Sequence, residues 1–224
     1  MRNKEAYAMK YLRMLAIAVV LLVAVSSSGC KFWTWAYDFT APGATLEDWY
    51  HDSGGEYNLD DNGLAMWHKT ISTPVFFIGN ITVTVTFDLD VDEDSKARFE
   101  IGLTEGILWG STDGMYIDMW CIGDQENEGW LIQEWDSNNY VFYQEQGPVG
   151  PLFYQGENTV KLTKCGDTYT FFLNGAKMYT MVAKFADLSE SFVSIWTGQN
   201  EMGNLLIKNV EVKYEEISEP WPII

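Results

Sequence analysis

Apolar and polar residues alternate along most of this chain. The clearest stretch is Ile81–Asp92, where six apolar side chains share one face and threonines and aspartates share the other. Alternation over twelve residues is typical of a β-strand with one face buried and one in water. We therefore predict a half-buried strand here.

Two hairpins are expected from turn signals between alternating runs. Glu93–Lys96 separates Ile81–Asp92 from a second alternating run at 97–103. Asn174-Gly175 separates two β-rich runs in "DTYTFFLNGAKMYTMV", and Asn-Gly is the strongest short hairpin signal. Further strands are predicted at Gly114–Ile122, Trp130–Trp135, Tyr140–Gln144, Asn158–Lys164, Ser191–Thr197 and Leu205–Tyr214.

One irregularity and one short helix complete this pattern. The apolar parity of Leu205–Tyr214 changes between Ile207 and Val210, which indicates a bulge near Asn209. Only Ala183–Ser189 has a helical pattern. Many strands at short spacing predict an all-β fold, a two-sheet antiparallel sandwich.

The first thirty residues have the plan of an export signal. Basic residues precede the apolar run Leu15–Val25, and Ser26–Gly29 lead to Cys30. Eleven apolar residues are too few to span a bilayer as a helix, so residues 1–29 are predicted to be a signal-peptide helix, with Met9 as an alternative start. The remaining divisions are a connection at 30–35, a domain at 36–215 and a tail at 216–224.

The end of that segment resembles a bacterial lipobox, although Ser27 stands where leucine is usual. The resemblance implies that Cys30 is lipidated and that the protein is anchored to the bacterial cell envelope. The alternative is a secreted protein cut near the serines.

Charge restricts the partners. Residues 1–29 hold four of the 14 basic and one of the 32 acidic residues, which leaves 10 basic and 31 acidic residues and a formal charge of −21. Such a surface excludes nucleic acid. Neutral ligands, cationic ligands and divalent cations remain. Cys121 and Cys165 are expected to be buried thiols, with one disulfide as the alternative.

Three stretches resemble the concanavalin A-like lectin/glucanase superfamily. They are "YDFTAP…LEDWYHDSGGEYNLDDNGLAMW", "NTVKLTKCGDTYTFFLNGAKM" and "FVSIWTGQNEMGNLLIKNVEVKY". The resemblance implies a jelly roll whose concave sheet binds glycans, and whose first and last strands are neighbours.

The catalytic pattern of the glucanases in that superfamily is incomplete here. Their Glu-x-Asp-x-x-Glu pattern finds its nearest stretch in "MYIDMWCIGD", where only Asp118 matches and Tyr116 and Cys121 replace the glutamates. We therefore expect no glucanase activity of that type. A hydrolase or lyase that uses Asp118, Glu134 or Asp136 is the alternative, and a structural or protein-interaction domain is a third reading.

Aromatic residues and carboxylates supply the predicted glycan site, because sugar rings stack on indoles and sugar hydroxyls bind carboxylates. The candidates are Tyr116, Asp118, Trp120, Trp130, Glu134, Trp135 and Trp196. The alternative for each aromatic residue is packing in the core. No cofactor is expected, although Asp88, Asp90 and Asp92 form an acidic row that Ca²⁺ favours. The alternative for that row is a solvated strand face.

The sequence after Cys30 adds an expectation about orientation. Phe32 and Trp33 follow the cysteine with no polar tether, and Trp221 lies near the end of the chain. Because tryptophan favours the membrane interface, these three side chains are expected to lie against the bilayer. The alternative is that the two tryptophans pack on the domain. The oligomeric state is left open.

Overall fold

The computed structural model describes residues 32–90, 96–106, 113–122, 129–136, 141–146, 156–184, 188–198 and 205–218. Within these ranges the chain forms fifteen β-strands, and every strand pair is antiparallel. The described part contains no helix long and apolar enough to cross a membrane. The signal segment at 1–29 and Cys30 lie outside the described residues.

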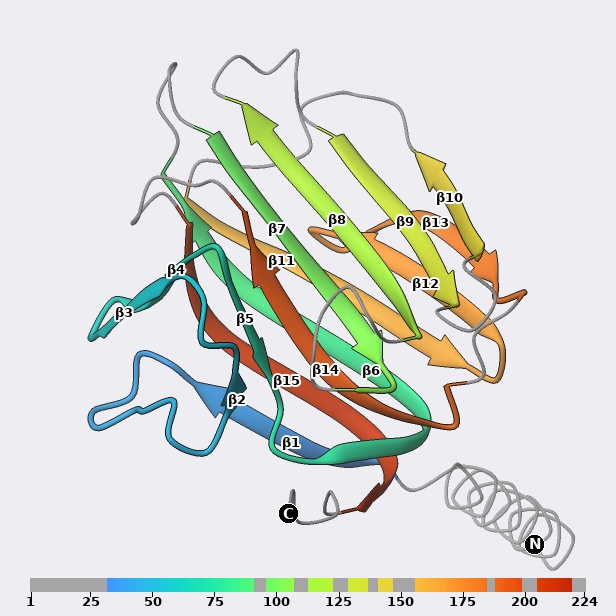
Figure 1. The fold of residues 1–224 in the computed structure, drawn as a ribbon, viewed down its shortest axis with the longest axis horizontal. Coiled ribbons are helices and arrows are strands. Elements are labelled where there is room, and N and C mark those ends of the chain that lie inside the picture. Colours follow the sequence, from blue (N-terminus) through green and yellow to red (C-terminus); the bar gives the residue numbers. More distant parts are fainter. Residues whose placement is uncertain are drawn as a thin grey trace, which may run out of the picture. The chain divides into compact units, whose positions relative to one another are not determined.

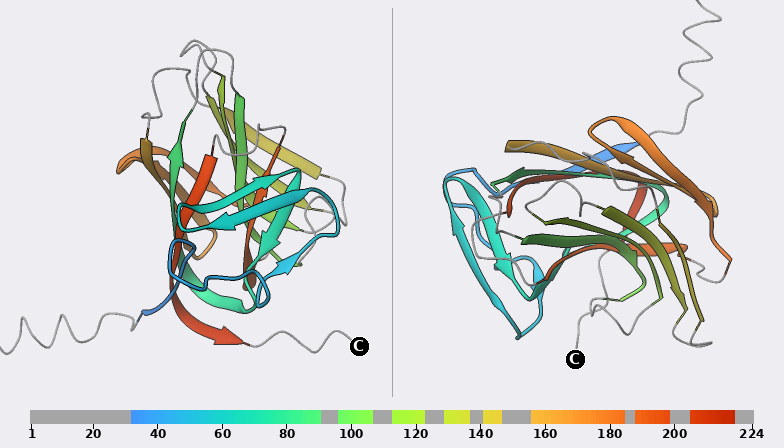
Figure 2. Two further views of the ribbon diagram at one scale, coloured as in Figure 1. Left: turned by 90° about the vertical axis from the view of Figure 1, so that its left-hand side faces the viewer. Right: turned by 90° about the horizontal axis from the view of Figure 1, so that it is seen from above.

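The strands divide into two layers (Figures 1 and 2). Sheet A contains β1 (Trp33–Asp38), β3 (Glu56–Asp60), β4 (Gly63–Trp67), β6 (Phe76–Leu89), β11 (Gly156–Cys165), β12 (Thr168–Leu173), β13 (Ala176–Val182) and β15 (Leu205–Ser218). Sheet B contains β2 (Tyr50–His51), β5 (Lys69–Ser72), β7 (Lys96–Thr104), β8 (Gly114–Ile122), β9 (Gly129–Asp136), β10 (Val141–Gln146) and β14 (Glu190–Thr197).

One strand joins the two layers. β14 begins in register with β6, at Glu190 opposite Ile78, and then continues between β5 and β7 in sheet B. Sheet B therefore runs in the order β2-β5-β14-β7-β8-β9-β10. The all-β antiparallel sandwich predicted from the pattern is confirmed.

The first predicted hairpin is wrong. β6 and β7 follow each other in sequence, but β6 pairs with β11 and β15, whereas β7 pairs with β8 and β14. Their buried faces meet across the core instead, with the rings of Phe87 and Phe99 4.5 Å apart. Period-two alternation shows that each strand buries one face, and it does not show whether the next strand is a neighbour or lies in the opposite sheet.

The second hairpin and the bulge are confirmed. β12 and β13 pair around Asn174 and Gly175, which have φ of 49° and 79°, as a two-residue turn with two positive φ angles requires. The register of β15 against β6 shifts between Ile207 and Asn209. A second shift, between Tyr214 and Glu216, was not predicted.

Other parts of the pattern were read less well. The short strands β2 to β5 were not predicted, because they have two to five residues each and no long alternation. The predicted helix at 183–189 lies partly outside the described residues, and the described positions at its two ends are not helical. Cys165 is an exposed free thiol at the end of β11, so its predicted burial is wrong.

The core lies between the two sheets. Sheet A contributes the alternating face of β6 and sheet B contributes the corresponding faces of β7 and β8, and all of these side chains are buried. They are Ile81, Val83, Val85, Phe87, Leu89, Ala97, Phe99, Ile101, Leu103, Met115, Ile117 and Met119. The opposite faces of both sheets therefore point away from the core.

The first and last strands are neighbours, as expected. β1 pairs with β15 over its whole length, from Trp33 opposite Tyr214 to Asp38 opposite Asn209.

Candidate functional site

The outer face of sheet B carries the chemical groups of the predicted site. Because Met115, Ile117 and Met119 face the core, the alternate residues Tyr116, Asp118 and Trp120 of β8 lie on the other face. The strand register brings further residues onto that face: Arg98, Glu100 and Gly102 from β7, Leu131, Gln133 and Trp135 from β9, and Ser194 and Trp196 from β14. We call this set the outer face of sheet B.

An arginine–aspartate pair lies on this face, on the adjacent inner strands β7 and β8. Nε of Arg98 donates to both carboxylate oxygens of Asp118, at 3.0 and 3.2 Å, and Nη2 donates to Oδ2. The hydrogen bonds to Asp118 raise the pKa of Arg98. The Asp118 side chain is 2% exposed and that of Arg98 is 53% exposed, so the guanidinium covers the carboxylate and presents itself to solvent.

Two half-buried tryptophans lie beside this pair on neighbouring strands. The Arg98 guanidinium lies 5.5 Å from the ring centroid of Trp196 on β14, which is within the range of a cation–π contact. Trp120 of β8 is directly opposite Arg98 in the β7–β8 register. β8 and β14 are separated by β7, so the backbones of the two tryptophans are two strand spacings apart across the sheet, about 10 Å, and are offset by two residues along it.

Glycines beneath the aromatic rings set how those rings lie. A Cβ at Gly129 would collide with the Trp120 indole, and a Cβ at Gly102 or Gly114 would lie 2.6 Å from the Tyr116 ring. The Trp120 indole therefore lies over β9, and the Tyr116 ring lies over Gly102 of β7 and Gly114 of its own strand, a close approach that only glycine allows. The half-buried Trp120 indole gives a flat apolar surface, whereas the Tyr116 ring is buried.

A second carboxylate lies opposite Asp118. Glu100 pairs with Asp118 in the β7–β8 register and is 2% exposed, and Nε2 of Gln133 donates to its Oε2 at 3.3 Å. Directly opposite residues have Cβ atoms about 4.5–5.5 Å apart. The hydroxyls of Ser72, Thr104 and Ser194 continue the polar row, joined at 2.8 and 2.9 Å.

Two of the predicted site residues lie on the other side of the sheet. Trp130 is 2% exposed, and its ring packs against Phe171 and Tyr179 in the core. Glu134 is fully buried, and its two carboxylate oxygens accept hydrogen bonds from the backbone N–H of Lys184, both at 2.9 Å. Asp136 has the same parity on β9. Trp130 is therefore a core residue, and Glu134 holds the segment that follows β13.

The acidic row at the end of β6 is only partly described. Oδ2 of Asp88 forms an ion pair with Nζ of Lys208 at 2.8 Å. Asp90 lies just beyond the end of β6. Asp92 lies outside the described residues. Within the described ranges, no group of three His, Cys, Asp or Glu side chains has the spacing of a metal site.

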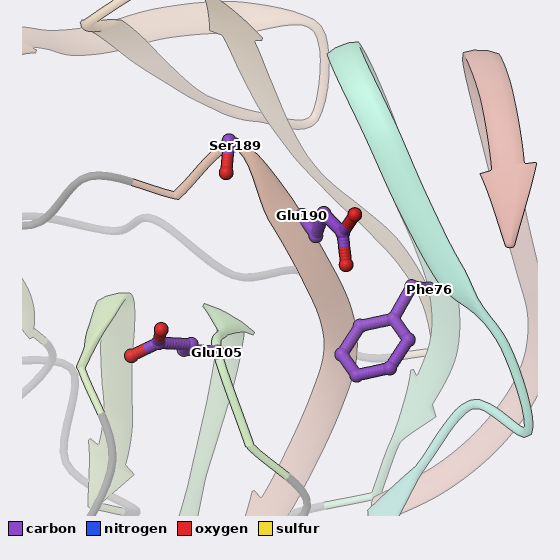
Figure 3. Close-up of a pocket in the computed structure, with 4 residues that line it drawn as sticks. All are labelled: Phe76, Glu105, Ser189 and Glu190. Atoms are coloured by element: carbon purple, nitrogen blue, oxygen red, sulfur yellow. The ribbon is translucent and has the colours of Figure 1, made fainter. Parts of the chain in front are cut away.

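A pocket of about 240 Å³ lies at the other end of β14. It is lined by Phe76, Glu105, Ser189 and Glu190, and the Glu105 carboxylate points away from the Phe76 ring (Figure 3). Its two glutamates are exposed to solvent, so the pocket offers no desolvated charge with which to fix a ligand.

Comparison with known proteins reveals the fold. No protein-family model and no curated relative matches the chain. Solved structures do match it. They include the apo Crh5 transglycosylase (TM-score 0.57, 16% identity, 82% of this chain and 85% of the other) and the CBM2 module of the evolved Dit of Lactobacillus casei BL23 phage J-1 (0.56, 12%, 85% and 100%). A galectin-like protein from Bacillus subtilis matches similarly (0.56, 13%, 83% and 100%).

The fold is a lectin-like jelly roll. These identities are low, so the likeness concerns the fold alone. The solved structures include a transglycosylase, a galectin-like fold and a legume lectin-like domain, which agrees with the jelly-roll fold expected from the sequence.

Sequence reasoning missed Arg98 and Glu100, the outward residues of a strand predicted correctly. Their signal was present, because they alternate with Ala97, Phe99 and Ile101. Their partner strand was assigned wrongly, so nothing placed them beside Asp118. The glycines under the rings carried no sequence signal of their own.

Proposed function

We propose that this chain is an exported, lipid-anchored module that binds a neutral glycan on the outer face of sheet B without cleaving it. The observation that carries the proposal is the exposed Arg98 guanidinium, held by Asp118 beside Trp120 and Trp196. Flat indoles suit the apolar faces of sugar rings. A guanidinium that is fixed in place and exposed suits sugar hydroxyls.

A neutral ligand fits the charge of this surface. Arg98 is the cation of the site, and Asp118 and Glu100 lie beside it. An anionic polysaccharide would be repelled by the two carboxylates beneath the guanidinium and by the net charge of −21 that residues 30–224 carry. The separation of the two tryptophans, two strand spacings across the sheet and two residues along it, also favours an oligosaccharide over a single sugar.

The anchor at Cys30 rests on the sequence pattern alone. Its test is detergent-phase partitioning, where wild type is expected in the detergent phase and Cys30→Ser in the aqueous phase. Equal partitioning of the two proteins would contradict the anchor.

The binding site is tested by removing one aromatic surface at a time. A glycan array first identifies the polysaccharide, and calorimetry then measures its affinity. Trp120→Ala and Trp196→Ala should each weaken binding by about 1–3 kcal/mol. Phe172→Ala is the matched control, because Phe172 is a half-buried ring under a lysine, 4.1 Å from Lys161 Nζ, on the outer face of sheet A. Folded tryptophan variants that bind as well as wild type would contradict the site, and an array with no binder would favour a protein-interaction domain.

A glycan-cleaving enzyme is the second candidate, and one observation favours it. Glu100 and Asp118 are opposite each other on one face, and retaining glycosidases need two carboxyl groups about 5–5.5 Å apart. Both oxygens of Asp118 are engaged by Arg98, however, which leaves that carboxylate poorly placed to attack a sugar. A reducing-sugar assay on the polysaccharide bound most tightly separates the two: release of sugar that Asp118→Asn abolishes would establish the enzyme.

A further inference from the structure

Three large apolar side chains are exposed where the described chain begins and ends. Phe32 is 49% exposed, Trp33 is 60% exposed and Ile217 is 38% exposed. The other large aromatic residues of β1, Trp35 and Tyr37, pack against the core. We call Phe32, Trp33 and Ile217 the entry patch.

The strand register brings the entry patch to one end of the domain. Trp33 is opposite Tyr214, and β15 continues past that position to Ser218. Because the two strands are antiparallel, the residues after Tyr214 run toward the side from which the chain enters β1. Figure 1 shows the start of β1 and the end of β15 together at the bottom of the domain.

Chain length limits how far this patch can lie from the proposed anchor. Cys30 is three residues before Trp33. Three extended residues span at most about 11 Å. The Trp33 backbone therefore lies within that distance of the backbone of the cysteine that carries the proposed lipid, whatever path residues 30–32 take.

We propose that the entry patch rests on the lipid bilayer and fixes the orientation of the domain; this rests on the proposed anchor at Cys30. Tryptophan prefers the interface at headgroup depth. One acyl chain alone gives only marginal attachment, so apolar contacts beside the anchor add to it. Of the predicted membrane contacts, Phe32 and Trp33 are exposed as this requires, and Trp221 lies outside the described residues.

This orientation has a consequence for the glycan site. The start of β7 and the end of β8, which carry Arg98 and Trp120, lie at the end of the domain opposite the entry patch (Figure 1). If the entry patch rests on the membrane, that end of the outer face of sheet B points away from the membrane. Glycans in the surrounding solution can then reach it.

Bromine quenching of tryptophan fluorescence tests the proposed contact between the entry patch and the bilayer. The lipidated full-length protein is reconstituted on phosphatidylcholine vesicles whose acyl chains carry bromine near the headgroup. Wild type should be quenched, and Trp33→Phe should lose a large part of that quenching. Trp67→Phe is the matched control, because Trp67 is an exposed tryptophan at the end of β4 and should make no difference.

A second variant keeps the reporter and removes its neighbours. Phe32→Ser combined with Ile217→Ser retains Trp33 and should reduce the quenching while vesicle attachment persists. Wild type that attaches to vesicles without quenching, or Trp33→Phe with unchanged quenching, would overturn the proposed contact of the entry patch with the bilayer. Neither result would contradict the lipid anchor at Cys30. Wild type that does not attach to vesicles would overturn both. Dimerisation in detergent that the double variant abolishes would assign the patch to a second copy of this chain instead.

Discussion

The outer faces of the two sheets differ in how they meet water. On sheet A the outward residues of β6 between Ile81 and Leu89 are three threonines and one aspartate, all half-buried, and the residues that alternate with them are buried. On β8 of sheet B, by contrast, Tyr116 and Asp118 point outward and are nevertheless 4% and 1% exposed. Each face also carries a cation over an aromatic ring, Lys161 over Phe172 on sheet A and Arg98 over Trp196 on sheet B.

The difference lies in what holds the cation. Arg98 is fixed by a buried carboxylate, whereas the ion pairs on sheet A join partners that are exposed or half-exposed, such as Lys213 and Glu211 at 3.2 Å. Water solvates the outer face of sheet A, so one side chain there can be substituted with little effect on the positions of the others. The groups on sheet B cover one another, which fixes their positions before any ligand arrives and lowers the entropy lost on binding.

Of the changes considered, removing the Asp118 charge should reduce the difference between the two faces most strongly. Asp118→Asn keeps the shape of the side chain but places an NH₂ donor against the Arg98 guanidinium. We expect glycan affinity to fall by about 1.5–3 kcal/mol, the usual contribution of hydrogen bonds to a charged group. Calorimetry with the polysaccharide found on the array measures the loss.

Glu211→Gln supplies the matched change on sheet A. It removes one charge from an exposed ion pair, so glycan affinity should stay unchanged and stability should change by at most about 1 kcal/mol. If both variants bind as well as wild type, the fixed position of Arg98 is irrelevant to binding.

The contrast between the faces also explains what the sequence could predict of the site. Tyr116, Asp118 and Trp120 were chosen correctly as residues of one face, because alternation along one strand is a local property. Trp130 and Glu134 were misplaced because parity on β9 relative to β8 depends on register, in which Leu131 is opposite Asp118. A shift of one residue moves every side chain to the other face, and no turn signal defined the register here.

Adding one methyl group under Trp120 should have a smaller effect. In Gly129→Ala the new Cβ meets the indole, which must leave its position on the sheet. Moving a side chain about 30° from its rotamer costs about 0.5–1.5 kcal/mol, and we expect a loss of affinity of that size. Gly54→Ala is the control, because a Cβ at Gly54 meets no atom within 4 Å. Unchanged binding and an unchanged near-ultraviolet circular dichroism spectrum in Gly129→Ala would show that the ring is not held by this contact.

The fold was more predictable than the site, and the wrong pairing of β6 with β7 has the same cause as the misplaced site residues. The strands β6, β8, β12 and β15 were found because each buries a row of apolar side chains on one side. The Asn174-Gly175 hairpin was found because its backbone conformation demands those residues. The connection from β6 to β7 crosses between sheets, and sequence spacing alone does not separate a crossing from a hairpin.

The smallest effect is expected on sheet A, at the pair between Lys208 and Asp88. Their side chains are 23% and 36% exposed, and their charged atoms are 2.8 Å apart. Exposed ion pairs contribute about 0.2–1 kcal/mol and weaken in salt. Lys208→Met should therefore lower the free energy of unfolding by that amount in urea titrations at low salt, and the difference from wild type should shrink in 1 M NaCl, where the Debye length is about 3 Å. Glycan affinity should not change.

A loss well above 1 kcal/mol that persists in salt would mean that the outer face of sheet A is organised as tightly as that of sheet B. If Ca²⁺ stabilises Lys208→Met but not wild type, the acidic row can bind a cation at the place that the Lys208 ammonium occupies in wild type.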